Sequence, residues 1–338
     1  MLHIPFQEVQ AQLKALLMSR GCNEPHADLT AREIARNSLE GVYTHGINRF
    51  PRLMRNIDAG SVRLNREPEV VGGFGALVRM DGGMGLGVVN ATRAMDKAIA
   101  LAKVHGVGLV ALRNTNHWMR AATYGYQACD AGMAAMLFTN TMPNMPAWGA
   151  VDARLGNNPL VLAIPHAGGH VVLDMAASQF SYGALELARL EGRKMPIDAG
   201  FDAQGALTRD PDAVIRSQRI LPMGYWKGAG LSQLLDLLAG CLSLGNTTLG
   251  IGQLPGDEQG LSQVFIAIHY TALGGQAEIE TLLQDTLDWV SASKPDGSGT
   301  PIRWPGSRVP EVRARNLAQG IPVDERVWQS ILALQPGA

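Results

Sequence analysis

The sequence is poor in cysteine, in aromatic residues and in net charge. Its 338 residues include three cysteines, Cys22, Cys129 and Cys241, which lie far apart and form no CxxC pair. This odd, scattered set argues against a disulfide framework and a structural zinc site, and it indicates reduced thiols in the cytoplasm. With 29 basic and 30 acidic residues, the chain has no excess charge to attract nucleic acid or an anionic membrane. Small molecules are therefore the expected partners.

Long hydrophobic runs are also missing. A membrane-spanning helix needs about 20 apolar residues, and the most apolar segment, 231–245, is interrupted by Gln233 and Asp236. Apolar residues recur at helical spacing from Phe6 to Leu16 with polar residues between them, which predicts an amphipathic helix rather than a signal peptide. The composition is 46% hydrophobic and 17% charged, typical of a globular protein with one large or two ordinary domains.

The first 60 residues read as helical. A second helix is expected over residues 24–40, and a third from Thr44, as its N-cap, to Gly60. Pro51 conflicts with the third helix, because proline lacks the N–H that an interior helical residue donates. The third helix must therefore kink or restart at this proline.

Residues 76–114 read as a strand, a glycine loop, a helix ending at Gly106 and a second strand. Further strands are expected near 134–140, 158–165, 170–176 and 264–270, and further helices near 178–191, 228–244 and 275–293. Helices and strands are intermixed without strict alternation. The sequence therefore predicts an α+β fold.

The glycine loop DGGMGLG is a candidate for dinucleotide binding. The usual fingerprint places glycines at positions i, i+2 and i+5, but counting from Gly83 gives Gly85 and then Val88. The fingerprint fails, so we interpret the loop as a structural turn that leads into the helix.

Two histidines, His166 and His170, have the i, i+4 spacing of a helical metal site. The glycines between them argue against the helix that would make this spacing meaningful, so no metal site is expected. His105 precedes Gly106 at a predicted helix end, where the helix dipole favours a cation, and we interpret it as structural.

His45 and His117 each lie in a cluster of polar residues. His45 and Arg49 are four residues apart, so in a helix they would point into the same space. Asn116 and His117 follow a predicted strand, where site residues are common. From the residues alone, catalysis or substrate contact stays open beside a surface role or a satisfied polar role.

Several longer runs are similar to one known family: GVYTHGINRFPR, GLVALRNTNHWMRAATYGYQA, MPAWGA, NPLVLAIP, ILPMGYWKGAGLS and SQVFIAIHY. In this order, and over nearly the whole chain, they resemble the malate/L-lactate/L-sulfolactate dehydrogenase family. These are NAD(P)-dependent oxidoreductases unrelated to the Rossmann lactate dehydrogenases. The RNTNHWMR and LPMGYWKG segments look specific to the members that reduce 2,3-diketo sugar acids.

The resemblance implies a homodimer and an architecture. A helical domain is expected over residues 1–75, joined by 300–338, and an α+β cofactor-binding domain over 76–299. The implied sheet is mixed and largely antiparallel, and it is not a Rossmann fold. This agrees with the failed glycine fingerprint.

The resemblance also implies a reaction, the NADH-dependent reduction of 2,3-diketo-L-gulonate to 3-keto-L-gulonate with His45 as the proton donor. The planar guanidinium group of Arg49 can bind the substrate's carboxylate through two hydrogen bonds. Asn116 and His117 can donate hydrogen bonds to other substrate oxygens. By the same resemblance, the residues expected to contact NAD(H) are His170, Val171, Val172, Leu173, Asp174, Met175, Ala176, Trp226, Lys227, Gly306, Ser307 and Arg308.

The sequence departs from its relatives at three places. Thr44 replaces a serine and adds a methyl group, and GNNP at 156–159 replaces Gly-Thr-Asn-Pro. Ser307 and Arg308 replace a pair that includes an acidic residue. Because arginine can accept a 2′-phosphate, NADP(H) stays open beside NAD(H).

Two other functions stay open. One keeps the family but changes the substrate to malate, lactate, ureidoglycolate or another 2-oxo or 2-hydroxy acid, or to a cyclic imino acid. The other is a metal-dependent hydrolase that uses His45, His117 and the HAGGH pair.

Overall fold

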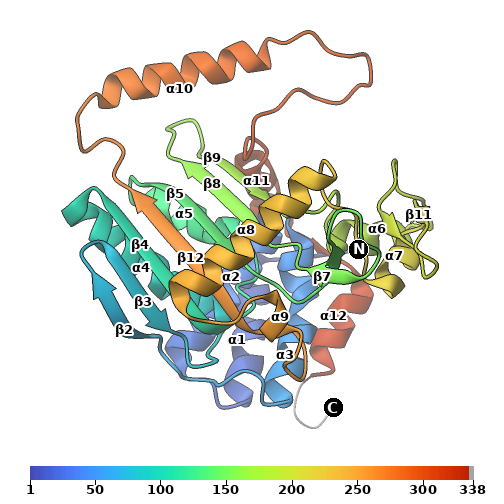
Figure 1. Cartoon of the computed structure of the whole chain (residues 1–338). Coiled ribbons are helices and arrows are strands. Elements are labelled where there is room, and N and C mark those ends of the chain that lie inside the picture. Colours follow the sequence, from blue (N-terminus) through green and yellow to red (C-terminus); the bar gives the residue numbers. More distant parts are fainter. Residues whose placement is uncertain (335–338) are drawn as a thin grey trace.

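A mixed seven-stranded sheet forms the centre of the computed structural model, which describes residues 1–334 (Figure 1). The strand order is β2-β3-β4-β12-β5-β8-β9. The strands are β2 (Glu69–Phe74), β3 (Leu77–Asp81), β4 (Val107–Asn116), β12 (Gln259–Ile268), β5 (Ala134–Thr139), β8 (Leu160–Ile164) and β9 (Val171–Met175). All seven are rich in the apolar and β-branched residues that suit strands.

Only one neighbouring pair in this sheet is parallel. β3 and β4 run parallel because the helix α4 (Gly87–His105) connects them, whereas all other neighbours are antiparallel. Gly106 ends α4 in the left-handed conformation, as its position after the helical pattern predicts. The predicted α+β class with a largely antiparallel, non-Rossmann sheet is confirmed.

Helices cover both faces of the sheet (Figure 1). α4 and α5 (Ala122–Asp130) bury one face, with Tyr124 and Phe265 among the fully buried side chains. The helix α8 (Trp226–Ser243) crosses the other face and packs Leu235 and Ala239 against Phe138 of β5. The sheet is therefore a rigid platform for the segments at its edges.

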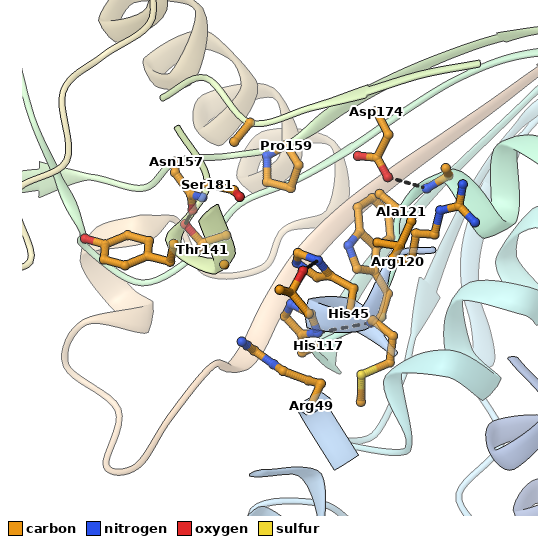
Figure 2. Close-up of a pocket in the computed structure, with 18 of the residues that line it drawn as sticks. His45, Arg49, His117, Arg120, Ala121, Thr141, Asn157, Pro159, Asp174 and Ser181 are labelled. Atoms are coloured by element: carbon orange, nitrogen blue, oxygen red, sulfur yellow. Dashed lines mark hydrogen bonds between the residues drawn. The ribbon is translucent and has the colours of Figure 1, made fainter. Parts of the chain in front are cut away.

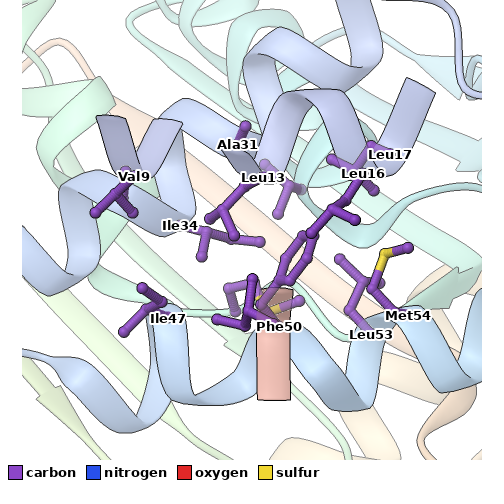
Figure 3. Packing of buried hydrophobic residues seen from close by; sticks show 14 of the residues in the cluster. Val9, Leu13, Leu16, Leu17, Ala31, Ile34, Ile47, Phe50, Leu53 and Met54 are labelled. Carbon is purple, nitrogen blue, oxygen red and sulfur yellow. The ribbon is translucent and has the colours of Figure 1, made fainter. Parts of the chain in front are cut away.

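A helical layer lies beside the sheet and has its own core (Figure 3). It contains α1 (Phe6–Ser19), α2 (Glu24–Leu39) and α3 (Phe50–Asp58), with α11 (Val309–Gln319) and α12 (Glu325–Leu332) from the end of the chain. Phe50, Leu13 and Ile34 are fully buried in this core. The strand β1 (Leu2–Ile4) pairs with β13 (Ile321–Val323), so the two ends of the described chain share one layer. The predicted domain boundaries stay a prediction.

The third predicted helix is wrong in its start. Thr44 does not cap a helix; it lies inside a 3₁₀ turn, η1 (Tyr43–His45), which is followed by η2 (Ile47–Arg49). Gly46, whose backbone is not helical (φ −111°, ψ −130°), separates the two turns. Pro51 falls in the first turn of α3, where its missing N–H costs nothing. The helix therefore restarts at the proline.

A small lobe projects from the sheet between β9 and α8 (Figure 1). It consists of α6 (Tyr182–Leu190), β10 (Gly200–Phe201), β11 (Leu207–Thr208) and α7 (Pro211–Ser217), and it has a separate apolar core. Short elements complete the chain: β6 (Met145–Pro146), β7 (Ala153–Leu155), α9 (Thr248–Ile251) and α10 (Gln276–Ser291). Within residues 1–334, no helix has both the length and the apolar character to cross a membrane.

Candidate active site

A cavity of about 560 Å³ opens where the helical layer, the ends of β4 and β9, and the small lobe meet. This volume lies in the usual range for small-molecule sites. His45, Arg49 and His117 line one side, and Thr141, Asn157 and Ser181 lie across from them (Figure 2). Segments far apart in the sequence therefore form one pocket.

His45 is held at the cavity wall by its neighbours in the helical layer. The side-chain amide of Asn37 donates to the backbone carbonyl of His45 at 3.0 Å, and Thr44 Oγ1 lies 3.2 Å from His45 Nδ1. The ring stacks on that of His117, with 5.9 Å between centroids and 14° between planes. The ring orientation is thus fixed by contacts on two sides.

The surroundings of His45 favour its neutral form. Burial lowers the pKa of His45 below its ordinary value, and the guanidinium of Arg49 lowers it further. The carboxylates of Asp174 and Glu258 oppose this lowering. A group that binds Arg49 and neutralises its charge would therefore raise the pKa of His45.

His117 is a neutral hydrogen-bond donor to the cavity. Burial and the charge of Arg49 hold the pKa of His117 well below its ordinary value. The backbone N–H of Met119 donates to His117 Nδ1 at 3.0 Å, so this nitrogen is the acceptor of the neutral ring. The proton then lies on Nε2, which can donate to an oxygen of a bound molecule.

Arg49 is engaged by an acidic residue that the sequence analysis missed. Its Nη2 donates to Glu258, which precedes β12, and the neighbouring Arg52 pairs with Asp257 through two nitrogens. Burial disfavours the charge of Glu258, but the guanidinium groups of Arg49 and Arg52 hold its pKa well below its ordinary value. Glu258 is therefore an anion in the cavity wall.

Four of the predicted cofactor residues line the same cavity. Val172, Asp174 and Ala176 project from β9 and the residue after it, and Gly306 lies beside them. The backbone N–H of Ala122 donates to Asp174 Oδ2 at 2.9 Å, which fixes this carboxylate at the start of α5. β9 therefore supplies one wall of the cavity.

The structure brings the three predicted cofactor segments together around β9. Val172 N–H donates to the carbonyl of Pro305 at 3.0 Å, which places the 306–308 segment along β9. Met223 N–H donates to the carbonyl of Ala177 at 2.9 Å, which places the start of α8 at the other end of β9. The predicted cofactor residues that do not line the cavity are His170, Val171, Leu173, Met175, Trp226, Lys227, Ser307 and Arg308.

Asn116 has a different environment from the one the sequence analysis expected. Its side-chain amide donates to the carbonyls of Met84 and Gly85 at 2.8 and 2.9 Å, and it does not line the cavity. These bonds hold the glycine loop against β4, which supports the interpretation of that loop as a structural turn. The substrate contact of Asn116 stays a prediction without support from this geometry.

The small lobe and the loops around residues 141–144 and 157 form a polar wall that the sequence analysis did not foresee. α6 reaches the helical layer at Gly183, where an added Cβ would lie 2.7 Å from Thr44 Cβ, so only glycine fits against the threonine methyl. The polar groups on this side are Thr141, Asn144, Asn157, Ser181, Tyr182, Glu186 and Gln218. They come from separate loops and helices with no shared motif, so only the fold reveals them.

The HAGGH histidines face separate carboxylates. His166 Nδ1 lies 2.8 Å from Glu280 of α10, and His170 Nε2 lies 3.0 Å from Asp130. In the described part of the chain, no three His, Cys, Asp or Glu side chains are grouped to hold a metal ion. The hydrolase alternative therefore gains no support.

The site can bind an anion and protonate an oxygen beside it. Arg49 supplies a cation, His117 a neutral donor and His45 an imidazole whose charge depends on the neighbouring charges. These functions match the polarisation of a carbonyl next to a carboxylate.

Known proteins with the same sequence pattern are reductases and dehydrogenases. Residues 4–332 match the malate/L-lactate dehydrogenase family. The 2,3-diketo-L-gulonate reductases of Citrobacter koseri and Escherichia coli K12 are each 42% identical over 331 residues. Each alignment covers 98% of this chain and 99% of the relative.

Solved structures share the whole fold. A putative malate/lactate dehydrogenase from E. coli superposes with a TM-score of 0.93 at 28% identity and covers 100% of this chain and 97% of its own. The sulfolactate dehydrogenase from Methanocaldococcus jannaschii gives a TM-score of 0.89 at 27% identity, covering 98% and 96%.

Proposed function

The chain belongs to the malate/L-lactate dehydrogenase family, and from this premise we propose that it reduces the C2 ketone of 2,3-diketo-L-gulonate with NADH. It is an oxidoreductase. The observation that carries the proposal is the placement of His45, His117 and Arg49 on one wall of a cavity that β9 also lines. The names of the relatives at 42% identity support the diketo sugar acid as substrate.

The residues around β9 suit a dinucleotide. Gly306 has φ +94°, and a Cβ on it would lie 2.7 Å from the carbonyl of His170, so its backbone lies directly against the strand. The start of α8 offers the ammonium group of Lys227 for phosphates, whereas the backbone N–H groups of Lys227 and Gly228 already donate to the carbonyls of Gly224 and Met223. When bound, NADH supplies the hydride.

We assign three roles to residues of this chain. Arg49 binds the carboxylate of the substrate and orients the neighbouring ketone. His117 donates a hydrogen bond from Nε2 to a substrate oxygen, and His45 gives its proton to the oxygen of the reduced carbonyl. Binding of an anion to Arg49 raises the pKa of His45 and so favours the protonated form when substrate is present.

We propose NADH as the coenzyme and keep NADPH as the alternative. The side chain of Arg308 is exposed at the start of α11, beside Gly306, where it is free to meet a 2′-phosphate. The ratio of kcat/KM with the two coenzymes decides between them.

A substrate panel tests the reaction. We expect oxidation of NADH with 2,3-diketo-L-gulonate to exceed that with pyruvate, oxaloacetate, ureidoglycolate-related 2-oxo acids and cyclic imino acids. Turnover of one of these compounds with no turnover of the sugar acid would move the assignment to another substrate within the family.

We propose a homodimer as the working assembly. The helix α10 stands off from the body and exposes Leu282 and Trp289, 64% and 79% accessible (Figure 1). The sheet face that α8 crosses leaves Met136 and Leu162, which are cross-strand neighbours, 39% and 38% accessible. An exposed apolar helix and an exposed apolar sheet face in one chain suit pairing with a second copy.

The predicted location in the cytoplasm stays a prediction. Cys22, Cys129 and Cys241 are all free thiols in the structure, which fits a reducing compartment.

A further inference from the structure

A second guanidinium, that of Arg52, lines the cavity beside Arg49. The side chain of Arg52 is 30% exposed and lies one turn after Arg49, so it is the next cation that an anionic substrate would meet. Its Nε and Nη2 both donate to Asp257, and its Nη2 lies 3.5 Å from Glu258. Asp257 therefore accepts a bidentate pair of hydrogen bonds from the guanidinium group of Arg52, which leaves this group less able to bind a ligand.

Arg49 keeps more hydrogen-bond donors for a ligand than Arg52 does. Within residues 1–334, only its Nη2 makes a hydrogen bond, to Glu258. Its Nε and Nη1 donors have no partner there, and each can donate to an oxygen of a bound molecule.

The charges that line the cavity balance. Three guanidinium groups face three carboxylates, namely Arg49, Arg52 and Arg120 against Asp174, Glu186 and Glu258. Arg120 is further neutralised by the buried carboxylate of Glu40 beneath it. A substrate with one negative charge finds one incompletely paired cation, whereas a second negative charge would face carboxylates in a partly buried site.

We propose that Asp257 and Glu258 select 2-oxo acids with one negative charge over those with a second acid group. Asp257 pairs with Arg52, so this cation cannot bind a second acid group, and the carboxylate of Glu258 repels one. We call these two residues the charge filter. The filter rests on the proposed function, and it defines the substrate class of the same site. The part of the substrate beyond the ketone meets the amides and hydroxyls of Thr141, Asn144 and Asn157, which suit a hydroxylated chain. Asp257 and Glu258 are therefore specificity-determining residues.

Binding of two matched ligands tests the filter. 2-Oxoglutarate carries two negative charges, and its 5-methyl ester carries one on the same carbon chain. Calorimetric titrations in the presence of NAD⁺ give both dissociation constants without turnover. For the wild-type protein we expect the ester to bind about 10- to 100-fold more tightly, the size of a like-charge repulsion a few ångströms away in a partly buried site.

Charge-removing and charge-retaining variants locate the effect. Glu258→Gln should reduce the preference for the ester to about 3-fold or less, because it removes the carboxylate at nearly constant volume. Glu258→Asp keeps the charge and should retain most of the preference. Asp257→Asn, which frees the fork of Arg52 without altering a residue that lines the cavity, should also tighten binding of 2-oxoglutarate. Thermal unfolding of each variant verifies that it is folded.

Three results would overturn the filter: a wild-type preference near one, a Glu258→Gln preference equal to that of the wild type, or an equal loss in Glu258→Asp. If Glu258→Gln does not fold, the wild-type preference for the ester and the affinity of Asp257→Asn for 2-oxoglutarate still test the proposal. Failure of the proposed function looks different, because it appears as a lack of turnover of 2,3-diketo-L-gulonate whatever the binding preference.

Discussion

At the scale of single residues, two imidazole rings share the cavity wall but differ in proton chemistry. His117 is fixed as a neutral donor by the N–H of Met119, whereas His45 has only the hydroxyl of Thr44 at its Nδ1. His45 is therefore the ring that can change its charge during a reaction. Its position between Arg49 and Asp174 lets both substrate and protein adjust its pKa.

Replacing His45 tests its role directly. We expect His45→Asn to lower kcat by about 10²- to 10⁴-fold, the usual value of a positioned acid, while NADH still binds. Single-turnover kinetics and fluorescence titration of NADH measure the two quantities. His117→Asn is the matched variant, and it should lower activity less because it removes a hydrogen bond and no proton donor. Near-normal turnover in His45→Asn would transfer the acid role to His117.

The pH dependence follows from the direction of the His45 shift. Reduction needs protonated His45, so kcat/KM for reduction should be highest at low pH and fall as pH rises through a pKa below 6.5. The reverse oxidation needs neutral His45 and should rise through the same pKa.

Asp174→Asn should move this pH profile to lower pH, because the carboxylate of Asp174 raises the pKa of His45. Rates measured over a range of pH with both proteins test this. A profile that stays in place in the variant would separate Asp174 from the titration.

Arg49→Lys should weaken substrate binding more than it slows turnover. Lysine keeps the charge beside Glu258 but loses the planar fork. Loss of about 1.5 kcal/mol for one charged hydrogen bond corresponds to a rise in KM of about 10-fold. Steady-state kinetics with 2,3-diketo-L-gulonate measure both constants, and a fall in kcat at constant KM would contradict the role of Arg49 as a clamp.

Local sequence identified some site residues and not others. His45, Arg49 and His117 were predicted, and the structure places all three on the cavity. Glu258 was missed because its partner Arg49 is 209 residues away in sequence, and no local pattern encodes such a pair. Asn116 shows the opposite case, in which a polar residue at a strand end serves the backbone of a nearby loop.

At the scale of elements, β9 connects every predicted cofactor segment. The loop before α11 can lie against β9 only because Gly306 has no side chain. Gly306→Ala should cost about 1–3 kcal/mol in local strain and displace this loop, so the Kd for NADH should rise about 10-fold or more.

Gly299→Ala is the matched control for this substitution. Gly299 also has a positive φ, +77°, but an added Cβ there meets nothing within 4 Å. The control should carry similar backbone strain without contact with β9, and the Kd for NADH should stay unchanged. Equal effects in the two variants would show that strain alone, and not closeness to β9, is responsible.

Most of the elements that the sequence predicted are present in the structure. The predicted helices overlap α1, α2, α4, α6, α8 and α10, and the predicted strands overlap β3, β4, β5, β8, β9 and β12. α5 was missed because it has only nine residues and because Gly125, a poor helix former, lies in its middle. The start of α3 was wrong because the backbone of Gly46 separates two 3₁₀ turns that sequence periodicity does not reveal.

At the scale of the whole molecule, α10 and the exposed part of the sheet predict a dimer. Leu282 and Trp289 lie seven residues apart and therefore on the same side of the helix. Glu280 ties α10 to His166 at 2.8 Å, so the helix is presented in a defined position. We expect light scattering to give twice the mass of the chain, and Trp289→Asp to shift the assembly toward monomer.

Val104→Asp is the control for the dimer test. Val104 is 76% accessible on α4, which covers the sheet face opposite to that of α8, so this charge should leave the mass unchanged. A wild-type mass equal to one chain would contradict the proposed homodimer.

The pairing of β1 with β13 has a consequence for how the chain folds during its synthesis. Ile4 lies opposite Ile321, so the partner of the first strand leaves the ribosome 317 residues later. At about 5–20 residues per second this interval lasts roughly 15 to 60 s. The first helices must wait for that time with part of their apolar surface uncovered, while the later sheet can already form. The amino-terminal layer is therefore the part of the nascent chain most exposed to chaperones and to aggregation.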